Sequence, residues 1–200
     1  MSRLRRRVLA VASLLLVGGM IAGCSSDPLA DQYREGSNKD YIAGDGSVET
    51  FAADNRQSPR EFTGETDSGD PVDSADLQGE VTVLNFWYAA CPPCRAEADD
   101  LEALNQEFQA DGVTFLGVNV RDEAANARAF ATAEGVTYPS VIDYRTADVQ
   151  LAFSDSIPPN AVPTTLVLDR KGRVAARILG RVTEPTTLET IIRDAVAEPE

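Results

Sequence analysis

A nearly continuous apolar run, Val81 to Trp87 (VTVLNFW), constrains the fold more than any other part of the sequence. Such a run, rich in β-branched residues, is typical of a strand buried on both faces, as in parallel sheets that helices cover on both sides. A helical stripe follows from Pro93 to Phe108, with apolar residues at Ala98, Leu101 and Leu104. This pairing of strand and helix predicts an α/β domain.

The remaining patterns extend this plan to a mixed sheet flanked by helices. A turn cluster at Asp67 to Pro71, inside Phe62 to Val72, predicts a hairpin before the main strand. Further strands are predicted at Val113–Val120, Val141–Ile142, Thr164–Leu168 and Val174–Leu179, the last two joined by a turn at Asp169–Gly172. Further helices are predicted from the N-cap Asp122 to Gly135, around Val149 to Phe153, and from the N-cap Thr183 through Val196.

Composition excludes several classes of function. The chain of 200 residues is 43% hydrophobic, and its 18 Lys and Arg against 32 Asp and Glu give a net charge of −14. A nucleic-acid partner is not expected, because binding nucleic acid requires a basic surface. The absence of histidine excludes Ser-His-Asp and Cys-His catalytic arrangements, His-ligated zinc and proximal-His haem. The three cysteines are therefore the most informative reactive groups.

The N-terminus has the pattern of an export signal. Arginines at positions 3, 5, 6 and 7 precede an uncharged apolar stretch from Val8 to Ala22. This stretch is shorter than the ~20 apolar residues that a membrane-spanning helix needs. The stretch ends in Met20 to Cys24 (MIAGC), which resembles the lipobox of bacterial lipoproteins, where the chain is cut before the cysteine and its thiol carries a diacylglycerol. We expect residues 1–23 to be a signal peptide and Cys24 to be the lipid attachment site. An uncleaved anchor with an incidental cysteine is the alternative.

Residues 24–59 are predicted to be the lipidated cysteine and a flexible tether. They are rich in Ser, Asp, Gly, Asn and Gln, and their few apolar residues show no sustained period. Whether the piece from Tyr41 to Phe51 packs on the domain is left open by the sequence. The domain itself is predicted to span residues 60–200.

The motif Cys91-Pro92-Pro93-Cys94 lies between the first buried strand and its helix, which places Cys91 at the helix N-cap and Cys94 at the third helical position. A helix N-terminus favours a thiolate, which is the attacking species in disulfide exchange. Zinc sites use the same spacing, but this chain offers neither histidine nor a further free cysteine for the missing ligands. An inert structural disulfide is the remaining alternative.

The stretch Asn85 to Glu97 (NFWYAACPPCRAE) resembles the active-site signature of the TlpA/ResA-type thioredoxin-like thiol-disulfide oxidoreductases, and Val162 to Thr165 (VPTT) resembles their cis-proline loop. The likeness covers about Phe62 to Val196. It implies a thioredoxin fold with a central insertion, which fits the long connection from Arg121 to Asn160. It also implies reduction of exported proteins, including apocytochromes c.

The resemblance suggests roles for single residues. Asn85 occupies the place of a buried acid in thioredoxins, and Glu97 matches an acid near the cysteines that could relay a proton to the more buried thiol, although a solvated helix glutamate is an equal alternative. Pro163 would present the backbone of Val162 to a substrate segment. Two departures are Ala90, where a tryptophan is usual, and Asp99, where a proline is common. Trp87 could shield the site or fill the core, and Arg95 is expected on the surface.

The expected activity is dithiol-disulfide exchange at the extracytoplasmic face of the cell membrane, in which Cys91 attacks and the less exposed Cys94 resolves. We expect a monomer that needs no separable cofactor, reduces exported proteins and is recharged by a transmembrane electron donor. A copper-handling thiol module is one alternative, since two thiolates suit Cu(I). A binding lipoprotein with a static disulfide is another. A peroxidase is disfavoured because Tyr88 stands where threonine or serine would be needed.

Overall fold

A computed structural model describes residues 46–158 and 160–199. The chain divides into two units, residues 1–36 and 37–200, and all described residues belong to the second. The predicted signal peptide, Cys24 and the first part of the predicted tether lie outside the described residues. Within the part of the chain that the structure describes, no helix has the length and apolar character needed to cross a membrane.

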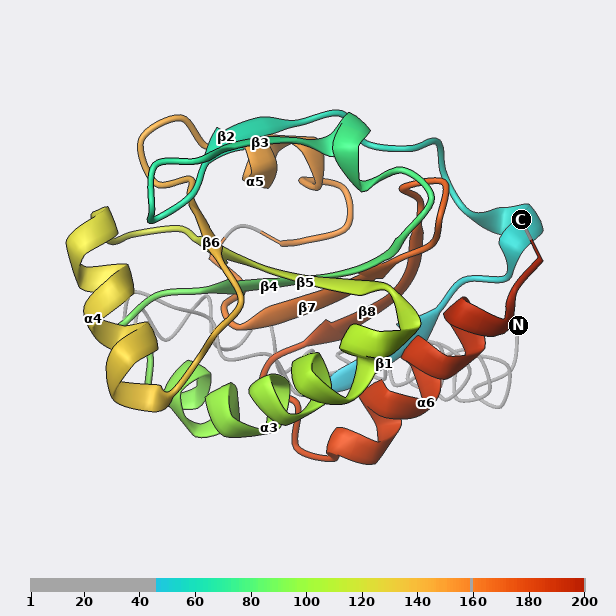
Figure 1. Ribbon diagram of the computed structural model, residues 1–200. Coiled ribbons are helices and arrows are strands. Elements are labelled where there is room, and N and C mark those ends of the chain that lie inside the picture. The colour runs from blue at the N-terminus through green and yellow to red at the C-terminus, as the bar shows by residue number, and fades with distance from the viewer. Residues whose placement is uncertain (1–45, 159, 200) are drawn as a thin grey trace, which may run out of the picture. The chain divides into compact units, whose positions relative to one another are not determined.

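The centre of the domain is a six-stranded mixed sheet with the strand order β1-β8-β7-β4-β5-β6 (Figure 1). Its strands are β1 (Ser47–Thr50), β4 (Val81–Trp87), β5 (Val113–Asn119), β6 (Ser140–Ile142), β7 (Thr164–Leu168) and β8 (Val174–Leu179). β4, β5 and β6 are parallel, whereas β7 runs antiparallel to β4, β8 to β7 and β1 to β8. All seven residues of β4 are buried, as the nearly continuous apolar run predicts.

Helices and a hairpin cover the two faces of this sheet. α3 (Pro92–Phe108), α4 (Ala124–Glu134) and α6 (Pro185–Ala197) lie on one face. The short α5 (Asp148–Ala152) and the hairpin of β2 (Thr63–Glu65) and β3 (Pro71–Asp73) lie on the other (Figure 1). Short 3-10 helices complete the fold: η1 (Ala53–Asn55), η2 (Ser74–Leu77) and η3 (Gln109–Asp111). The predicted α/β architecture, the hairpin and the extra segment between β5 and β7 are all present.

Three details of the sequence prediction differ from the structure. The range predicted to be a tether contains β1 and η1, because β1 pairs along the exposed edge of β8. Ordered chain therefore begins at least as early as residue 46. Asp122 and Thr183 are not the N-caps of α4 and α6. Those positions belong to Glu123 and Glu184, neither of which makes a side-chain cap.

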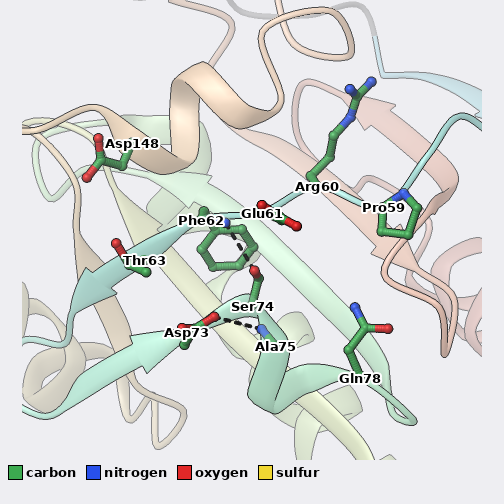
Figure 2. Close-up of a pocket in the computed structure, with 10 residues that line it drawn as sticks. All are labelled: Pro59, Arg60, Glu61, Phe62, Thr63, Asp73, Ser74, Ala75, Gln78 and Asp148. Atoms are coloured by element: carbon green, nitrogen blue, oxygen red, sulfur yellow. Dashed lines mark hydrogen bonds between the residues drawn. The ribbon is translucent and has the colours of Figure 1, made fainter.

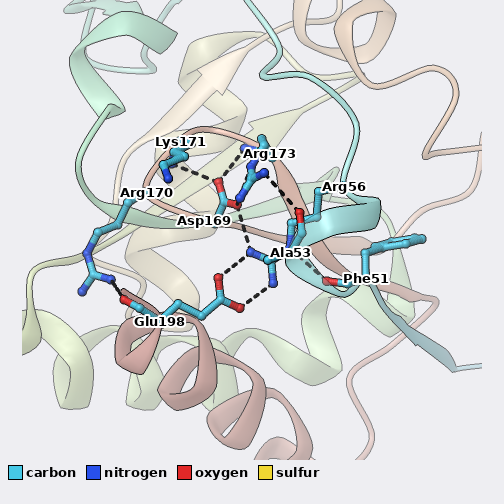
Figure 3. A network of polar contacts seen from close by, with 8 residues as sticks. All are labelled: Phe51, Ala53, Arg56, Asp169, Arg170, Lys171, Arg173 and Glu198. Carbon is cyan, nitrogen blue, oxygen red and sulfur yellow. Dashed lines mark hydrogen bonds and ion pairs between the residues drawn. The ribbon is translucent and has the colours of Figure 1, made fainter. Parts of the chain in front are cut away.

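Arg56 fixes this early segment to the domain (Figure 3). Its guanidinium donates to Asp169 Oδ2 at 2.9 Å, forms an ion pair with Glu198 just after α6, and donates from Nε to the carbonyl of Phe51. Asp169 also accepts the backbone N–H groups of Lys171 and Arg173, so it serves the β7–β8 turn as well. One partly buried network thus joins the N-terminal segment, the turn and the C-terminal end of α6.

Candidate active site

Cys91 and Cys94 form a disulfide at the start of α3, with their Cα atoms 5.3 Å apart. Cys91 is the N-cap residue, Pro92 and Pro93 are the first two helical residues, and Cys94 is the third, as the spacing predicts. The backbone N–H of Cys94 donates to Cys91 Sγ at 3.2 Å. Because Pro93 has no N–H, the cap sulfur receives only one of the two backbone donors that an N-cap side chain normally meets.

The expected difference in exposure between the two cysteines is not observed. Cys91 is 0% exposed and Cys94 is 3% exposed in the disulfide form. Both belong to a cluster of buried residues at the end of the sheet that also contains Trp87, Tyr88, Ala98, Ala127, Phe130 and Val162. Any division of roles between the cysteines must therefore come from their positions relative to the helix.

The loop before β7 faces this cluster. The Val162–Pro163 peptide bond is cis, as the resemblance implies, and Val162 packs among the residues around the disulfide. The carbonyl of Pro163 accepts the N–H of Gly180, which holds the loop to the residue directly after β8. A groove of about 270 Å³, lined largely by apolar residues, borders Val162 and extends to Phe86 and α5.

Glu97 lies one turn inside α3 from the disulfide and has no exposed surface. Its Oε1 accepts from Asn85 Nδ2 at 2.9 Å, and its Oε2 accepts from the backbone N–H of Val182 at 2.8 Å. Burial raises the pKa of Glu97 to about 7, although these two hydrogen bonds oppose the rise. The alternative of a solvated helix glutamate is therefore wrong.

A small cavity of about 10 Å³ lies between Cys94 and the polar groups beneath it. Asn85, Ser140 and Tyr138 are among its lining residues. This volume is close to the least that can hold one water molecule. Asn85 also donates to Glu97, so one side chain both binds the carboxyl group and lines the same cavity as the inner cysteine.

Trp87 belongs to the core of the site rather than to its surface. It is 5% exposed, its ring lies 4.3 Å from that of Phe130, and its Nε1 donates to Ser140 Oγ at 3.2 Å. Gly117 makes this contact possible, because a Cβ there would lie 2.2 Å from Ser140 Oγ and 2.8 Å from Trp87 Nε1. Arg95 is on the surface as predicted, paired with Glu134.

One group of site residues is absent from the sequence prediction. Ala89 lies two residues before Cys91, and its backbone N–H donates to Asp122 at 2.6 Å. The guanidinium of the adjacent Arg121 lies 4.5 Å from the ring centroid of Tyr88. Asn119 at the end of β5 binds Asp122 in turn. The polar pattern Asn-x-x-Asp directly after a buried strand was the available signal.

A larger cavity, of about 740 Å³, lies beside the β2–β3 hairpin and contains none of the residues around the disulfide. Two of its polar lining side chains already accept hydrogen bonds from the protein backbone. Ser74 Oγ accepts the N–H of Phe62, and Asp73 accepts the N–H of Ala75 (Figure 2). Among residues 46–158 and 160–199, no three His, Cys, Asp or Glu side chains gather as metal ligands.

Comparisons with known proteins agree with this geometry. The chain is 35% identical to the DsbF homologue from Corynebacterium diphtheriae, covering 76% of this chain and 94% of that one with a TM-score of 0.66. It is 32% identical to a secreted thiol-disulfide isomerase from Corynebacterium glutamicum, covering 79% and 97% with a TM-score of 0.69. The predicted thioredoxin-type fold is thereby confirmed.

Curated relatives match a shorter part. The thiol-disulfide oxidoreductase ResA of Bacillus subtilis is 30% identical over 123 residues, which are 62% of this chain and 66% of that protein. The chain spans between 60% and 66% of the length of the ResA proteins with comparable matches. The redoxin family model matches residues 53–192, which include the disulfide, Glu97 and the cis-proline loop. With well over half of its length matched, the chain belongs to the redoxin family.

Proposed function

We propose that this protein is an extracytoplasmic thiol-disulfide oxidoreductase, anchored by a lipid on Cys24, that reduces disulfides in exported proteins. The observation that carries the proposal is the Cys91–Cys94 disulfide at the N-terminus of α3, packed against the cis Val162–Pro163 loop. The similarity of this chain to the thiol-disulfide oxidoreductase ResA and to the secreted thiol-disulfide isomerase supports the same chemistry.

The reaction uses the reduced pair. The Cys91 thiolate attacks one sulfur of a substrate disulfide, forming a mixed disulfide and releasing the other substrate sulfur as a thiolate. Cys94 then attacks Cys91 Sγ, which restores the Cys91–Cys94 disulfide and releases the second substrate thiolate. Both electrons pass to the substrate, so the pair must be reduced again by a dithiol carried by a membrane protein. No separable cofactor enters these steps.

Two further residues support the exchange. Glu97 takes the proton from the Cys94 thiol before it attacks, since a carboxyl group with a pKa of about 7 can both accept and return a proton near neutral pH. Pro163 turns the backbone of Val162 toward a substrate segment, which would add to it as a strand does. The groove beside Val162 offers room for an apolar side chain of that segment.

The direction of reaction is proposed to be reduction. A disulfide is a strong oxidant when its reduced form is stabilised, and among the residues that the structure describes the Cys91 sulfur accepts from one backbone N–H, that of Cys94. We therefore expect a midpoint potential below about −200 mV, on the thioredoxin side of the known range. Equilibration against glutathione measures it, and a value near −120 mV, as in strong oxidants, would reverse the proposed direction.

Anchoring at Cys24 agrees with the acidic chain, since an anionic membrane surface would repel it without acyl chains. Cys24→Ala should lose fatty-acid label and detergent-phase partitioning.

Among exported proteins, apocytochromes c are the substrates that the resemblance to ResA-type proteins suggests. The protein is proposed to act as a monomer.

Substrate trapping tests the function. Cys94→Ala should accumulate mixed disulfides with exported proteins, because the resolving thiol is missing, and Cys91→Ala should not. The double variant is the matched control for disulfides formed by other thiols. Equal trapping by the two single variants, or trapping only by Cys91→Ala, would contradict the assigned roles.

A further inference from the structure

The turn that leads into the disulfide is held by side chains from elsewhere in the domain. Residues 88–91 form a tight turn in which the N–H of Cys91 donates to the carbonyl of Tyr88 at 3.1 Å. Inside this turn, the N–H of Ala89 donates to Asp122 at 2.6 Å, and the carbonyl of Ala89 accepts from Arg95 Nη1 at 3.3 Å. Ala89 therefore has both backbone polar groups bound by charged side chains.

Asp122 is itself fixed by the ends of the parallel strands. Its Oδ2 also accepts from Asn119 Nδ2 at 2.9 Å, and Asn119 Oδ1 accepts the backbone N–H of Asp122 at 2.7 Å. Asn119 is 0% exposed and lies opposite Trp87 in the parallel pairing of β4 and β5. The acceptor for Ala89 is thus placed by the sheet and not by a free loop.

We propose that Asp122 is a positioning residue for Cys91, acting through the N–H of Ala89, an inference that rests on the proposed exchange activity. The contact matters most after reduction. In the disulfide form, the Cys91–Cys94 bond holds the cap sulfur in place by itself. In the dithiol form, the preceding turn must keep Cys91 Sγ near the N–H of Cys94, which is its one observed backbone donor.

Asp122 therefore stabilises the reduced form more than the oxidised form. A purely structural residue would stabilise both forms alike and leave the midpoint potential unchanged. Besides Asp122, the charged side chains that contact this turn are Arg121, over the Tyr88 ring, and Arg95, which binds the carbonyl of Ala89 and pairs with Glu134. The buried Glu97 lies one turn further into α3, and these groups are unchanged in the variants below.

The experiment compares four full-length proteins: wild type, Asp122→Ala, Asp122→Asn and the matched control Glu123→Ala. Glu123 is the neighbouring acid, exposed and bound to Arg145 and Tyr144. Two readouts are used on each protein. One is the pH profile of Cys91 alkylation in the reduced protein, followed on the Cys91 peptide by mass spectrometry. The other is the midpoint potential against a dithiol buffer.

For Asp122→Ala, we expect Cys91 to react about tenfold more slowly at neutral pH, the effect of one charge-assisted hydrogen bond, and the potential to become more negative. Asp122→Asn keeps an acceptor oxygen and should lie closer to wild type. Should Asp122→Ala fail to fold, Asp122→Glu, which keeps the charge but moves the acceptor, should shift both readouts in the same direction.

Three results would overturn the inference: an Asp122→Ala profile and potential equal to wild type, an Asp122→Asn change as large as that of Asp122→Ala, or an equal change in Glu123→Ala. Alkylation needs no substrate, so the two proposals can fail separately. A wild type without exchange activity overturns the proposed function, whereas an active wild type matched by Asp122→Ala overturns only this inference.

Discussion

Glu97 combines complete burial with two hydrogen-bond donors aimed at its carboxyl oxygens. The donors favour the carboxylate and burial favours the neutral acid, and burial has the larger effect on its pKa. The folded protein therefore binds this proton more tightly than the unfolded chain, in which the pKa of a glutamate is about 4.3. A residue in this state ties the stability of the domain to pH across the range in which thiols also begin to ionise.

The stability of the domain should depend on pH through Glu97. Between pH 4.5 and 7 the folded state holds the Glu97 proton that the unfolded state has lost, so the free energy of unfolding should decrease as pH rises. Above pH 7 this contribution is fully lost. Glu97→Gln should remove it, changing the difference from wild type by about 3 kcal/mol between pH 4.5 and pH 8, as measured by urea unfolding at each pH.

Glu102 provides a control on the same helix. Burial opposes its ionisation, but hydrogen bonds from Thr137, Gln106 and Asn105 hold its pKa below the usual value. Its contribution should therefore run in the opposite direction and be lost as pH falls. If Glu97→Gln and Glu102→Gln showed the same pH trend, the account of Glu97 would be wrong.

At the scale of elements, the close approach of β5 to the Trp87–Ser140 contact depends on Gly117. Gly117→Ala should destabilise the domain by about 1–3 kcal/mol, because the added methyl group overlaps the Ser140 hydroxyl and the indole nitrogen. Thermal or urea unfolding measures this. Adding Ser140→Ala removes the nearest atom, so the double variant should lose less than the sum of the single losses. Strictly additive losses would show that the overlap is relieved elsewhere.

The elements also show what can be predicted from sequence. β4 and the start of α3 carry strong local signals, a nearly continuous apolar run and a helix-initiating Cys-Pro-Pro-Cys, and both were predicted within a residue of their bounds. Asp122 and Thr183 have suitable residue types for N-caps, but tertiary structure uses Asp122 elsewhere, at Ala89. Local propensity cannot reveal a partner that lies 33 residues away in the chain.

β1 shows the same limit. Its four residues are all exposed, so they carry no apolar pattern that separates a strand from a tether. They become a strand because β8 presents an unpaired edge, a feature that exists only after the sheet has formed. The site cysteines, in contrast, were predictable because their chemistry depends on local helix geometry.

At the scale of the whole molecule, the N-terminal segment should be required for stability. A chain that begins at residue 60 loses β1 and Arg56, which exposes the edge of β8 and leaves the buried Asp169 with Arg173 as its remaining ion-pair partner. Breaking a buried ion pair costs about 3–5 kcal/mol. We expect such a chain to unfold at a lower urea concentration, and to aggregate more, than one that begins at residue 46.

The control is Arg56→Met in the longer chain, which removes the ion pairs but keeps β1. The stability of this variant should lie between that of the chain beginning at residue 60 and that of the chain beginning at residue 46. If the chain beginning at residue 60 were as stable as the longer one, the domain boundary at residue 60 would be correct and the Arg56 network would be dispensable.

The position of β1 also determines which end of the domain a membrane anchor near the N-terminus would be joined to. Ser47, Leu179, Thr164 and Phe86 lie in one row across the sheet, next to the end of β4 that leads to the disulfide. The chain that precedes residue 46 therefore enters the domain at the end of the sheet that carries the disulfide, its reactive end. A lipid on Cys24, the proposed attachment site, would therefore be joined through the chain to the reactive end of the domain and not to the opposite end of the sheet.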